Sequence, residues 1–276
     1  MNYLQFDFDV DGQAQTDQLI ALLAVQGFEG FEEEGEQLYA FVPEKDFDEQ
    51  AFSEVMDTFP TISYVKTVVE NINWNKRWEE GFTPVIIDDF VAVRATFHEA
   101  VSNVAHEIII TPKMSFGTGH HATTYLVIKQ MRLLDFNGKA VLDFGTGTGV
   151  LGILAQKLGA SEVLAIDYDD WSIENAKENI LQNSSENVRL LQADSVPVTE
   201  KFDIILANIT LNVIKSNLNL IFEASLPGAI ILFSGFLKDD ENTFIALLEK
   251  GGFDYLSTVQ RGDWIAVMAK KVEKTQ

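Results

Sequence analysis

Residues 141–152 constrain this chain most, because they join a predicted strand to a predicted helix through three glycines. They read VLDFGTGTGVLG, with Gly145, Gly147 and Gly149 at every second position. Glycine adopts positive φ angles at no steric cost and lets the backbone approach a ligand closely. The helix that begins at Val150 presents unpaired N–H groups to an anionic or carboxylate group. The run predicts a ligand site at a strand-to-helix turn; the alternative is a tight turn without a ligand.

An acidic residue, Asp167, lies 22 residues after Gly145, at the end of the next predicted strand. An acid at this place can accept hydrogen bonds from both ribose hydroxyls of a nucleoside. A dinucleotide fingerprint read from Gly145 needs Gly or Ala at position 150, where this chain has Val150. The spacing therefore favours a nucleoside site of the Gly-x-Gly-x-Gly kind; the alternative for Asp167 is a helix-capping acid.

Strand and helix patterns alternate from about residue 91 to the end of the chain. Helices are predicted at 122–134 and 150–158, and strands at 91–95, 107–111, 139–144, 162–167, 188–191, 202–208 and 229–233. Residues 253–260 and 264–270 flank an Arg-Gly-Asp turn as the strands of a hairpin do. The alternation favours an α/β domain with a mainly parallel sheet and helices on both faces, to which the hairpin adds an antiparallel strand.

Residues 1–70 are predicted to form a small α+β domain. The first strand, residues 3–10, alternates apolar and polar side chains, and a helix capped by Thr16 or Asp17 follows it and stops at Gly27. Strands at 28–31 and 37–42, a helix at 46–59 and a strand at 62–69 complete the order βαββαβ. This order is the ferredoxin-like pattern, which serves many functions.

Residues 71–90 are predicted to be a helical linker, so that the second domain spans residues 91–276. Trp74 and Trp78 are four residues apart and share one face of a helix. We expect both tryptophans to pack between the flanking domains; the alternative is that they face a substrate. Gly81 and Pro84 end the segment.

Composition excludes several classes of protein. The chain has no cysteine, which excludes disulfides, thiolate metal sites and a cysteine nucleophile. It has no signal peptide at its N-terminus and no window near the roughly 18 uninterrupted apolar residues of a membrane span, so we expect a soluble cytoplasmic protein.

The net charge is −22, and residues 1–60 hold 15 acidic side chains against one basic side chain, Lys45. Such a surface repels nucleic-acid phosphates, so no direct nucleic-acid binding is expected, and it attracts a cationic partner. The alternative is that the acidity only aids solubility.

Further motifs lie on either side of the glycine run. Residues 114–124 read MSFGTGHHATT, residues 206–209 read LANI, and residues 73–84 read NWNKRWEEGFTP. The glycine turn preceded by Asp143 resembles the S-adenosylmethionine site of class I methyltransferases. Together the motifs resemble the ribosomal protein L11 methyltransferase family (PrmA-type) over most of residues 70–270. In residues 1–70 the resemblance rests on the order of elements alone.

The resemblance implies a Rossmann-like, seven-stranded methyltransferase domain, preceded by a substrate-recognition domain and a helical linker. It implies methyl transfer from S-adenosylmethionine to lysine side-chain amines and the α-amine of a basic large-subunit ribosomal protein, ribosomal protein L11. No metal is expected. The alternatives are a methyltransferase for another protein or a small molecule, and a non-catalytic acidic chaperone for ribosomal proteins. Glutamine-methylating relatives carry Asn-Pro-Pro-Tyr after the fourth strand, whereas Ile209 follows Asn208 here.

Six residues are the candidates for binding the cofactor, and Asp194 among them is placed to meet the adenine amino group. They are Thr124, Gly145, Gly147, Asp167, Asp194 and Asn208. The alternatives are that Thr123 and Thr124 cap a helix, and that Asn208 and Asp194 are turn residues.

No catalytic residue is assigned. His120 or His121 as a general base is a less favoured alternative to a solvated or backbone-bonding histidine, and Phe116 either lines the methyl pocket or packs. The chain also departs from the family pattern, with His120 for Thr, Ala122 for Pro, Thr146 for a frequent Cys, and Thr210-Leu211 for Leu-Ala. These departures affect the expected substrate geometry more than the cofactor site.

Overall fold

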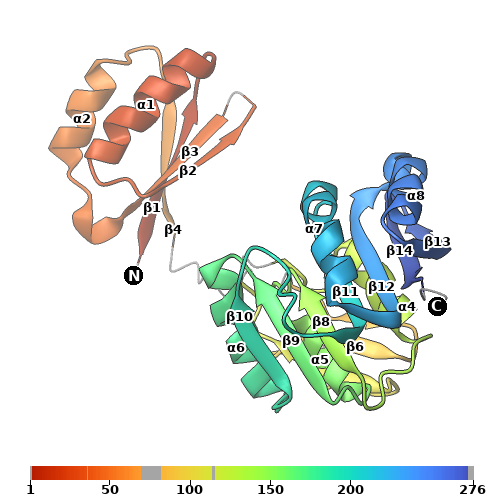
Figure 1. Cartoon of the computed structure of the whole chain (residues 1–276). Coiled ribbons are helices and arrows are strands. Elements are labelled where there is room, and N and C mark those ends of the chain that lie inside the picture. The colour runs from red at the N-terminus through yellow and green to blue at the C-terminus, as the bar shows by residue number, and fades with distance from the viewer. Residues whose placement is uncertain (1, 36, 70–81, 114–115, 273–276) are drawn as a thin grey trace. The chain divides into compact units, whose positions relative to one another are not determined.

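The computed structural model describes residues 2–35, 37–69, 82–113 and 116–272. Contacts divide the chain into two units, Met1–Phe82 and Thr83–Gln276, which are described separately (Figure 1). The predicted linker lies largely outside the described residues, and with it Trp74 and Trp78. Its described end, residues 82–90, contains no helix; Val85–Ile87 forms a strand, β5, that belongs to the second unit.

The first unit has the predicted order of elements. These are β1 (Tyr3–Asp9), α1 (Gln13–Val25), β2 (Gly30–Glu34), β3 (Gln37–Pro43), the 3₁₀ turn η1 (Glu44–Asp46), α2 (Glu49–Asp57) and β4 (Tyr64–Val69). The strands form one antiparallel sheet in the order β2-β3-β1-β4.

The core of this unit lies between the sheet and the two helices. The apolar residues of β1, Leu4, Phe6 and Phe8, are buried in alternation, as predicted. The Phe6 ring packs 4.5 Å from the Phe52 ring of α2, centroid to centroid. Full burial of one such side chain contributes roughly 1.5–3 kcal/mol to the stability of the unit.

The predicted cap of α1 is wrong. The helix begins at Gln13, so its N-cap position is Gly12, four residues before Thr16, and no side chain caps it. Thr16 is buried inside the helix, where its hydroxyl donates a hydrogen bond to the Gly12 carbonyl. The Gln15 side chain accepts a hydrogen bond from the Asp11 amide ahead of the helix, and Gly12 at the N-cap position has a positive φ of 85°.

The second unit is built on a seven-stranded sheet, which confirms the predicted α/β class. Its elements after β5 are β6 (Val91–Ala95), β7 (His106–Ile110), α4 (Ala122–Met131), β8 (Ala140–Phe144), α5 (Val150–Lys157), β9 (Glu162–Asp167), α6 (Asp170–Gln182), β10 (Val188–Gln192), β11 (Phe202–Asn208), α7 (Leu211–Ala224), β12 (Ser225–Leu237), the 3₁₀ turn η2 (Lys238–Asp240), α8 (Glu241–Lys250), β13 (Phe253–Arg261) and β14 (Trp264–Lys271).

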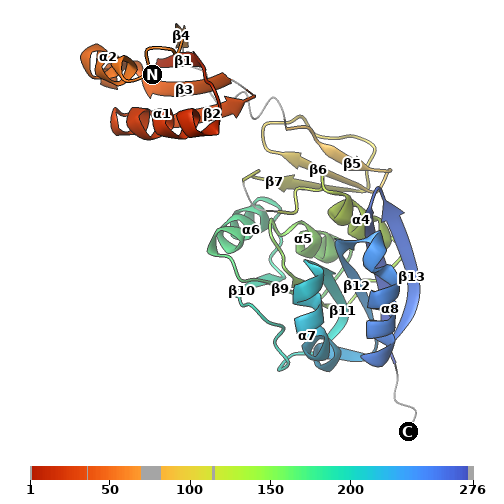
Figure 2. The same ribbon diagram turned by 90° about the horizontal axis from the view of Figure 1, so that it is seen from above.

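The strands of this sheet follow the order β10-β9-β8-β11-β12-β14-β13. All neighbours are parallel except at β14, which lies antiparallel between β12 and β13. Helices α4, α5 and α6 cover one face, and α7 and α8 cover the other (Figure 2). The carboxyl ends of β8, β9, β10 and β11 therefore meet at one edge, where open α/β sheets bind ligands.

Strands β5, β6 and β7 form a separate three-stranded sheet, which the alternation of patterns did not predict. Among the described residues no strand lies beyond its outer strand, β7, and side chains of α6 bond to the backbone there. We call Asn175, Asn179 and Asn183, four residues apart on α6, the asparagine ladder. These three side chains donate to or accept from the backbone of Ile109 and Thr111 at 2.6–3.0 Å. The ladder satisfies polar groups that an open sheet edge would leave unpaired.

None of the helices in the described parts of the chain combines the length and the apolar character that crossing a bilayer requires.

Candidate functional site

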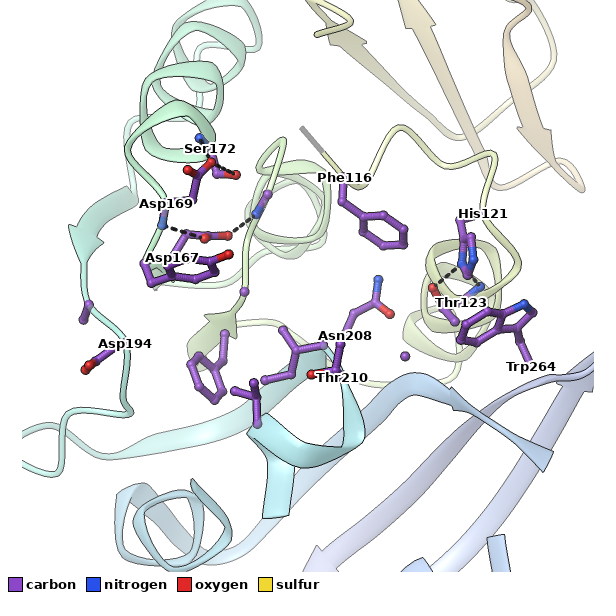
Figure 3. Close-up of a pocket in the computed structure, with 18 residues that line it drawn as sticks. Phe116, His121, Thr123, Asp167, Asp169, Ser172, Asp194, Asn208, Thr210 and Trp264 are labelled. Atoms are coloured by element: carbon purple, nitrogen blue, oxygen red, sulfur yellow. Dashed lines mark hydrogen bonds between the residues drawn. The ribbon is translucent and has the colours of Figure 1, made fainter. Parts of the chain in front are cut away.

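A cavity of about 660 Å³ opens at the carboxyl edge of the seven-stranded sheet (Figure 3). This volume lies within the usual range of small-molecule sites. The lining includes five of the six predicted cofactor residues and extends to residues from β14 and from the loop before α4. The lining residues are Phe116, His121, Thr123, Phe144, Gly145, Gly147, Asp167, Tyr168, Asp169, Ser172, Ala193, Asp194, Asn208, Ile209, Thr210, Val213, Gly235 and Trp264.

The glycine turn forms the floor of the cavity. Gly145 and Gly147 have φ angles of 75° and 54°, which other residues adopt at a cost. A Cβ atom at Gly145 would overlap the Ile209 side chain, and one at Gly147 would overlap the carbonyl oxygen of Phe116. The turn therefore needs glycine for its backbone angles and also for the close approach of two neighbouring segments.

The segment that carries Phe116 is fastened to this turn by hydrogen bonds. The Thr148 amide donates to the Phe116 carbonyl at 3.0 Å, and the Thr148 hydroxyl donates to the Gly117 carbonyl at 2.9 Å. The Thr148 carbonyl in turn accepts a hydrogen bond from Asn179 of the asparagine ladder at 2.8 Å. The Phe116 wall and the glycine floor are thus held in one arrangement.

Asp167 ends β9 beside the turn and is 8% exposed. One carboxylate oxygen accepts the Gly147 amide at 2.9 Å, and the other accepts the Asp169 amide at 3.1 Å. A carboxylate oxygen can accept two hydrogen bonds, so each oxygen of Asp167 can still receive a hydroxyl group from a ligand. The residue therefore shapes the turn and also faces the cavity, while its contact with a ribose stays a prediction.

Asp143 lies behind the turn and is fully buried. One of its oxygens accepts the Thr146 hydroxyl at 2.6 Å and the Gly152 amide at 3.0 Å, while the other has no partner within the described structure. Burial raises the pKa of Asp143 to about 6, against the opposing effect of these two hydrogen bonds. Folding therefore shifts Asp143 toward its protonated form, which predominates only below about pH 6.

We expect Asp143→Asn to remove a pH dependence of stability. Because the folded-state pKa is raised from 3.8 to about 6, the stabilisation is complete below pH 3.8 and is lost as the pH rises through 6. The change between pH 4.5 and pH 7.5 is about 2 kcal/mol. Urea unfolding of the cofactor-free protein measures the free energy of unfolding. Between pH 4.5 and pH 7.5 this free energy should rise by about 2 kcal/mol for the Asp143→Asn variant relative to the wild type. A constant difference would contradict the raised pKa.

Asn208 ends β11 and faces the cavity, with Thr124 behind it. The Asn208 amide group donates to the Thr124 hydroxyl at 3.2 Å, and both residues are buried. The Asn208 Oδ1 atom has no hydrogen-bond partner among the described residues, which is costly for a buried carbonyl unless a ligand supplies a donor. Thr124 does not line the cavity; the structure gives it the role of orienting Asn208, and its direct cofactor contact stays a prediction.

His120 and His121 both have hydrogen-bond partners. His120 bonds to the Thr83 carbonyl and the Thr118 hydroxyl. His121 caps α4: its Nδ1 accepts from the Thr123 amide at 3.3 Å and lies 2.8 Å from the Thr123 hydroxyl. The alternative that the threonines cap this helix is therefore wrong. Burial lowers the pKa of His121, so the ring is neutral at pH 7.

Asp194 lines the cavity beyond β10 and is exposed, and its contact with the adenine amino group stays a prediction. The sequence did not single out Tyr168, Asp169, Ser172, Gly235 or Trp264 as site residues. Of these, Gly235 has a φ of 102°, and a Cβ atom there would overlap the Ile209 carbonyl, which no sequence motif reveals.

The residues present fit a nucleoside that carries an amino-acid chain. The glycine floor admits close backbone approach, and the buried carboxylate of Asp167 suits a sugar diol. Within the described ranges no three His, Asp or Glu side chains are grouped as a metal site needs.

The strand order and this site define the class I S-adenosylmethionine-dependent methyltransferases. The family model of "Ribosomal protein L11 methyltransferase (PrmA)" matches residues 7–272. The chain is 34% identical over 276 residues to a ribosomal protein L11 methyltransferase of Bacteroides fragilis, covering 97% of this chain and 99% of that protein. It is 37% identical over 276 residues to one of Phocaeicola vulgatus, covering 97% and 98%. The chain belongs to the ribosomal protein L11 methyltransferase (PrmA) family, and S-adenosylmethionine is its methyl donor.

A solved structure agrees with this assignment. The ribosomal protein L11 methylase of Lactobacillus delbrueckii subsp. bulgaricus is 26% identical, with a TM-score of 0.65. The match covers 70% of this chain and all of that one.

Proposed function

We propose that this protein transfers methyl groups from S-adenosylmethionine to lysine side-chain amines and the N-terminal amine of ribosomal protein L11. Membership in the family supports the substrate, and the named relatives carry that substrate in their names. The observation that supports an amine acceptor is the unpartnered, buried Asn208 Oδ1 atom in the cavity wall. A carbonyl oxygen there accepts an N–H of an incoming amine.

When bound, S-adenosylmethionine would supply a methyl group on a cationic sulfur, so that a nitrogen–carbon bond would replace the carbon–sulfur bond and the nitrogen would release a proton. The protein has to orient the acceptor and exclude water. Asn208 accepts one N–H of the amine, which aims the nitrogen lone pair along the cavity. Thr124 holds the Asn208 amide in this orientation.

The acceptor amine has to be neutral when it attacks. A lysine side chain has a pKa near 10.4, so neutralising it at pH 7 costs about 4 kcal/mol unless a base or a water chain removes the proton. A largely apolar cavity lowers the pKa of an entering amine by desolvation. The His121 Nδ1 atom is already the acceptor in the cap of α4, so it is not a free proton acceptor.

Incubation of the protein with methyl-labelled cofactor and purified ribosomal protein L11, followed by mass spectrometry, tests the proposal. We expect label on lysine and N-terminal nitrogens. Label on another protein or a small molecule instead would favour a different acceptor. Stable binding of L11 without label would favour a non-catalytic chaperone. We also propose a cytoplasmic location, since the substrate is a ribosomal protein. The net charge of −22 supports a basic protein partner and argues against direct contact with nucleic acid.

We propose that the first unit holds the protein substrate on the sheet face that its helices leave uncovered. On this face Asp7 of β1, Tyr39 of β3 and Glu32 of β2 form one row across the sheet. Glu34 lies on the same face, whereas Lys66 pairs with Phe6 and so lies on the opposite one.

A cleft of about 370 Å³ lies at one end of the face, lined by Tyr3, Glu29, Gly30, Phe31, Glu32 and Phe41. Carboxylates beside aromatic rings suit the long, cationic side chains of a basic protein.

Neutralising this face should weaken methylation of L11 without changing cofactor binding. We expect the triple variant Asp7→Asn, Glu32→Gln, Glu34→Gln to lower kcat/KM for L11 about fivefold to tenfold at low salt, because exposed charge pairs contribute little individually. The difference in kcat/KM between variant and wild type should decrease at higher salt, because salt screens the attraction between the acidic face of the wild type and L11. Neutralising three exposed acids of the second unit, Asp239, Glu249 and Asp254, is the matched control. Equal effects of both triples would contradict docking on this face.

A further inference from the structure

The two ends of the cavity differ in chemistry. Its three carboxylates lie at the carboxyl ends of β9 and β10: Asp167 is the last residue of β9, Asp169 follows it, and Asp194 follows β10. The rings of Phe116, His121 and Trp264 lie at the other end, and Asn208 lies between the two groups (Figure 3). No carboxylate lines the aromatic end among the described residues. With the nucleoside held at the acidic end, the aromatic end is left for the acceptor.

The three rings form one continuous wall. The centroids of Phe116 and His121 are 5.0 Å apart, and those of His121 and Trp264 are 4.6 Å apart with an interplanar angle of 71°. The His121 ring is oriented by its bond to the Thr123 amide at the start of α4. Since His121 is neutral, the wall adds no charge of its own.

Trp264 is fixed from the side of the terminal hairpin. It begins β14 and pairs with Arg261, the last residue of β13. The Arg261 guanidinium lies 3.8 Å from the centroid of the Tyr125 ring on α4. The hairpin end and the start of α4 are thus joined through Arg261 on one side and through the His121–Trp264 contact on the other. The indole is preorganised against the cavity.

We infer that Trp264 is a specificity-determining residue, whose indole contacts the acceptor nitrogen and selects amines, with or without methyl groups, over uncharged acceptors. The inference rests on the proposed function, because it takes the acceptor to be an amine. Aromatic faces attract ammonium and quaternary ammonium groups without needing N–H donors. A carboxylate in their place would hold the proton on the amine more strongly. The wall therefore binds the amine, permits its deprotonation and still binds the nitrogen after it has gained a methyl group.

A binding measurement that needs no methyl transfer tests this directly. The full-length protein is saturated with S-adenosylhomocysteine and titrated with Nε-trimethyllysine amide or with its neutral carbon isostere. We expect the wild type to bind the cation at least about fivefold more tightly, and Trp264→Leu to bring the two affinities within about twofold. Trp171→Leu is the matched control, because Trp171 is 79% exposed and lies outside the cavity lining. Equal affinities in the wild type, no binding of the cation, or a preference that survives in Trp264→Leu would each overturn the inference.

Kinetics with ribosomal protein L11 give a second readout. We expect Trp264→Leu to lower kcat/KM about tenfold and Trp264→Phe to retain most of it, with cofactor affinity within about twofold in both. A comparable loss of cofactor affinity would place the indole in the cofactor site and overturn the inference. If the wild type prefers the cation but leaves L11 unmodified, the proposed substrate fails while the aromatic amine site stands.

Discussion

Gly147→Ala should lower the affinity for S-adenosylmethionine at least about a hundredfold, equivalent to about 2.7 kcal/mol. A left-handed φ of 54° costs an alanine roughly 1–2 kcal/mol by itself. The new Cβ would also overlap the Phe116 carbonyl oxygen, which the Thr148 amide holds in place. The glycine turn and the Phe116 segment would have to separate, and both line the cavity. Calorimetric titration with the cofactor measures the effect.

Gly138→Ala separates backbone strain from this overlap. Gly138 has a φ of 70°, and a Cβ atom there would meet nothing within 4 Å. We expect cofactor affinity within about twofold of the wild type and a melting temperature lower by roughly 2–8 °C, which reflects strain alone. A Gly147→Ala variant that binds cofactor within about threefold of the wild type would show that the contact between the two segments does not shape the site.

Asp167→Ala is expected to weaken cofactor binding by about 10-fold to 150-fold, because a hydrogen bond to a charged group contributes about 1.5–3 kcal/mol. The variant loses the proposed acceptor for the ribose hydroxyls. It also leaves the amides of Gly147 and Asp169 without their carboxylate partner. Titration with S-adenosylhomocysteine, which lacks the sulfonium charge, isolates the contribution of the sugar contact.

Two further variants control this measurement. Asp167→Asn keeps one side-chain oxygen for the backbone and should fall between the alanine variant and the wild type. Asp239→Ala makes the same change in net charge at an exposed position in η2 and should leave the affinity unaltered. Unchanged affinity in Asp167→Ala would remove this residue from the cofactor site.

Much of the fold could be predicted because local periodicity reflects burial directly. The strand at β9 was predicted to the residue, and the terminal hairpin within one residue at each strand end. Which strands become neighbours is a long-range property that periodicity does not contain. Strands β6 and β7 therefore looked like members of the main sheet, although they pair with β5 in a sheet of their own.

The same distinction between local and long-range order applies to the residues of the site. Gly145, Gly147 and Asp167 could be identified because one strand–turn–helix–strand unit brings them together within 23 residues. Trp264 could not, since it lies 143 residues after His121 and reaches it only because β14 is inserted between β12 and β13. Asn208 was found through its motif, but the support that Thr124 gives it required the structure.

The asparagine ladder restricts the length of the connection between β9 and α6. Three amides at a spacing of four residues match backbone atoms of Ile109, Thr111 and Thr148 in a single register. A helix rotates by about 100° per residue, so one residue inserted between Asp167 and Asp170 would either turn the amides away or force the extra residue to bulge beside the Asp167 carboxylate. Natural variation in chain length should therefore gather elsewhere in the second unit, in the surface turns remote from β9 and α6.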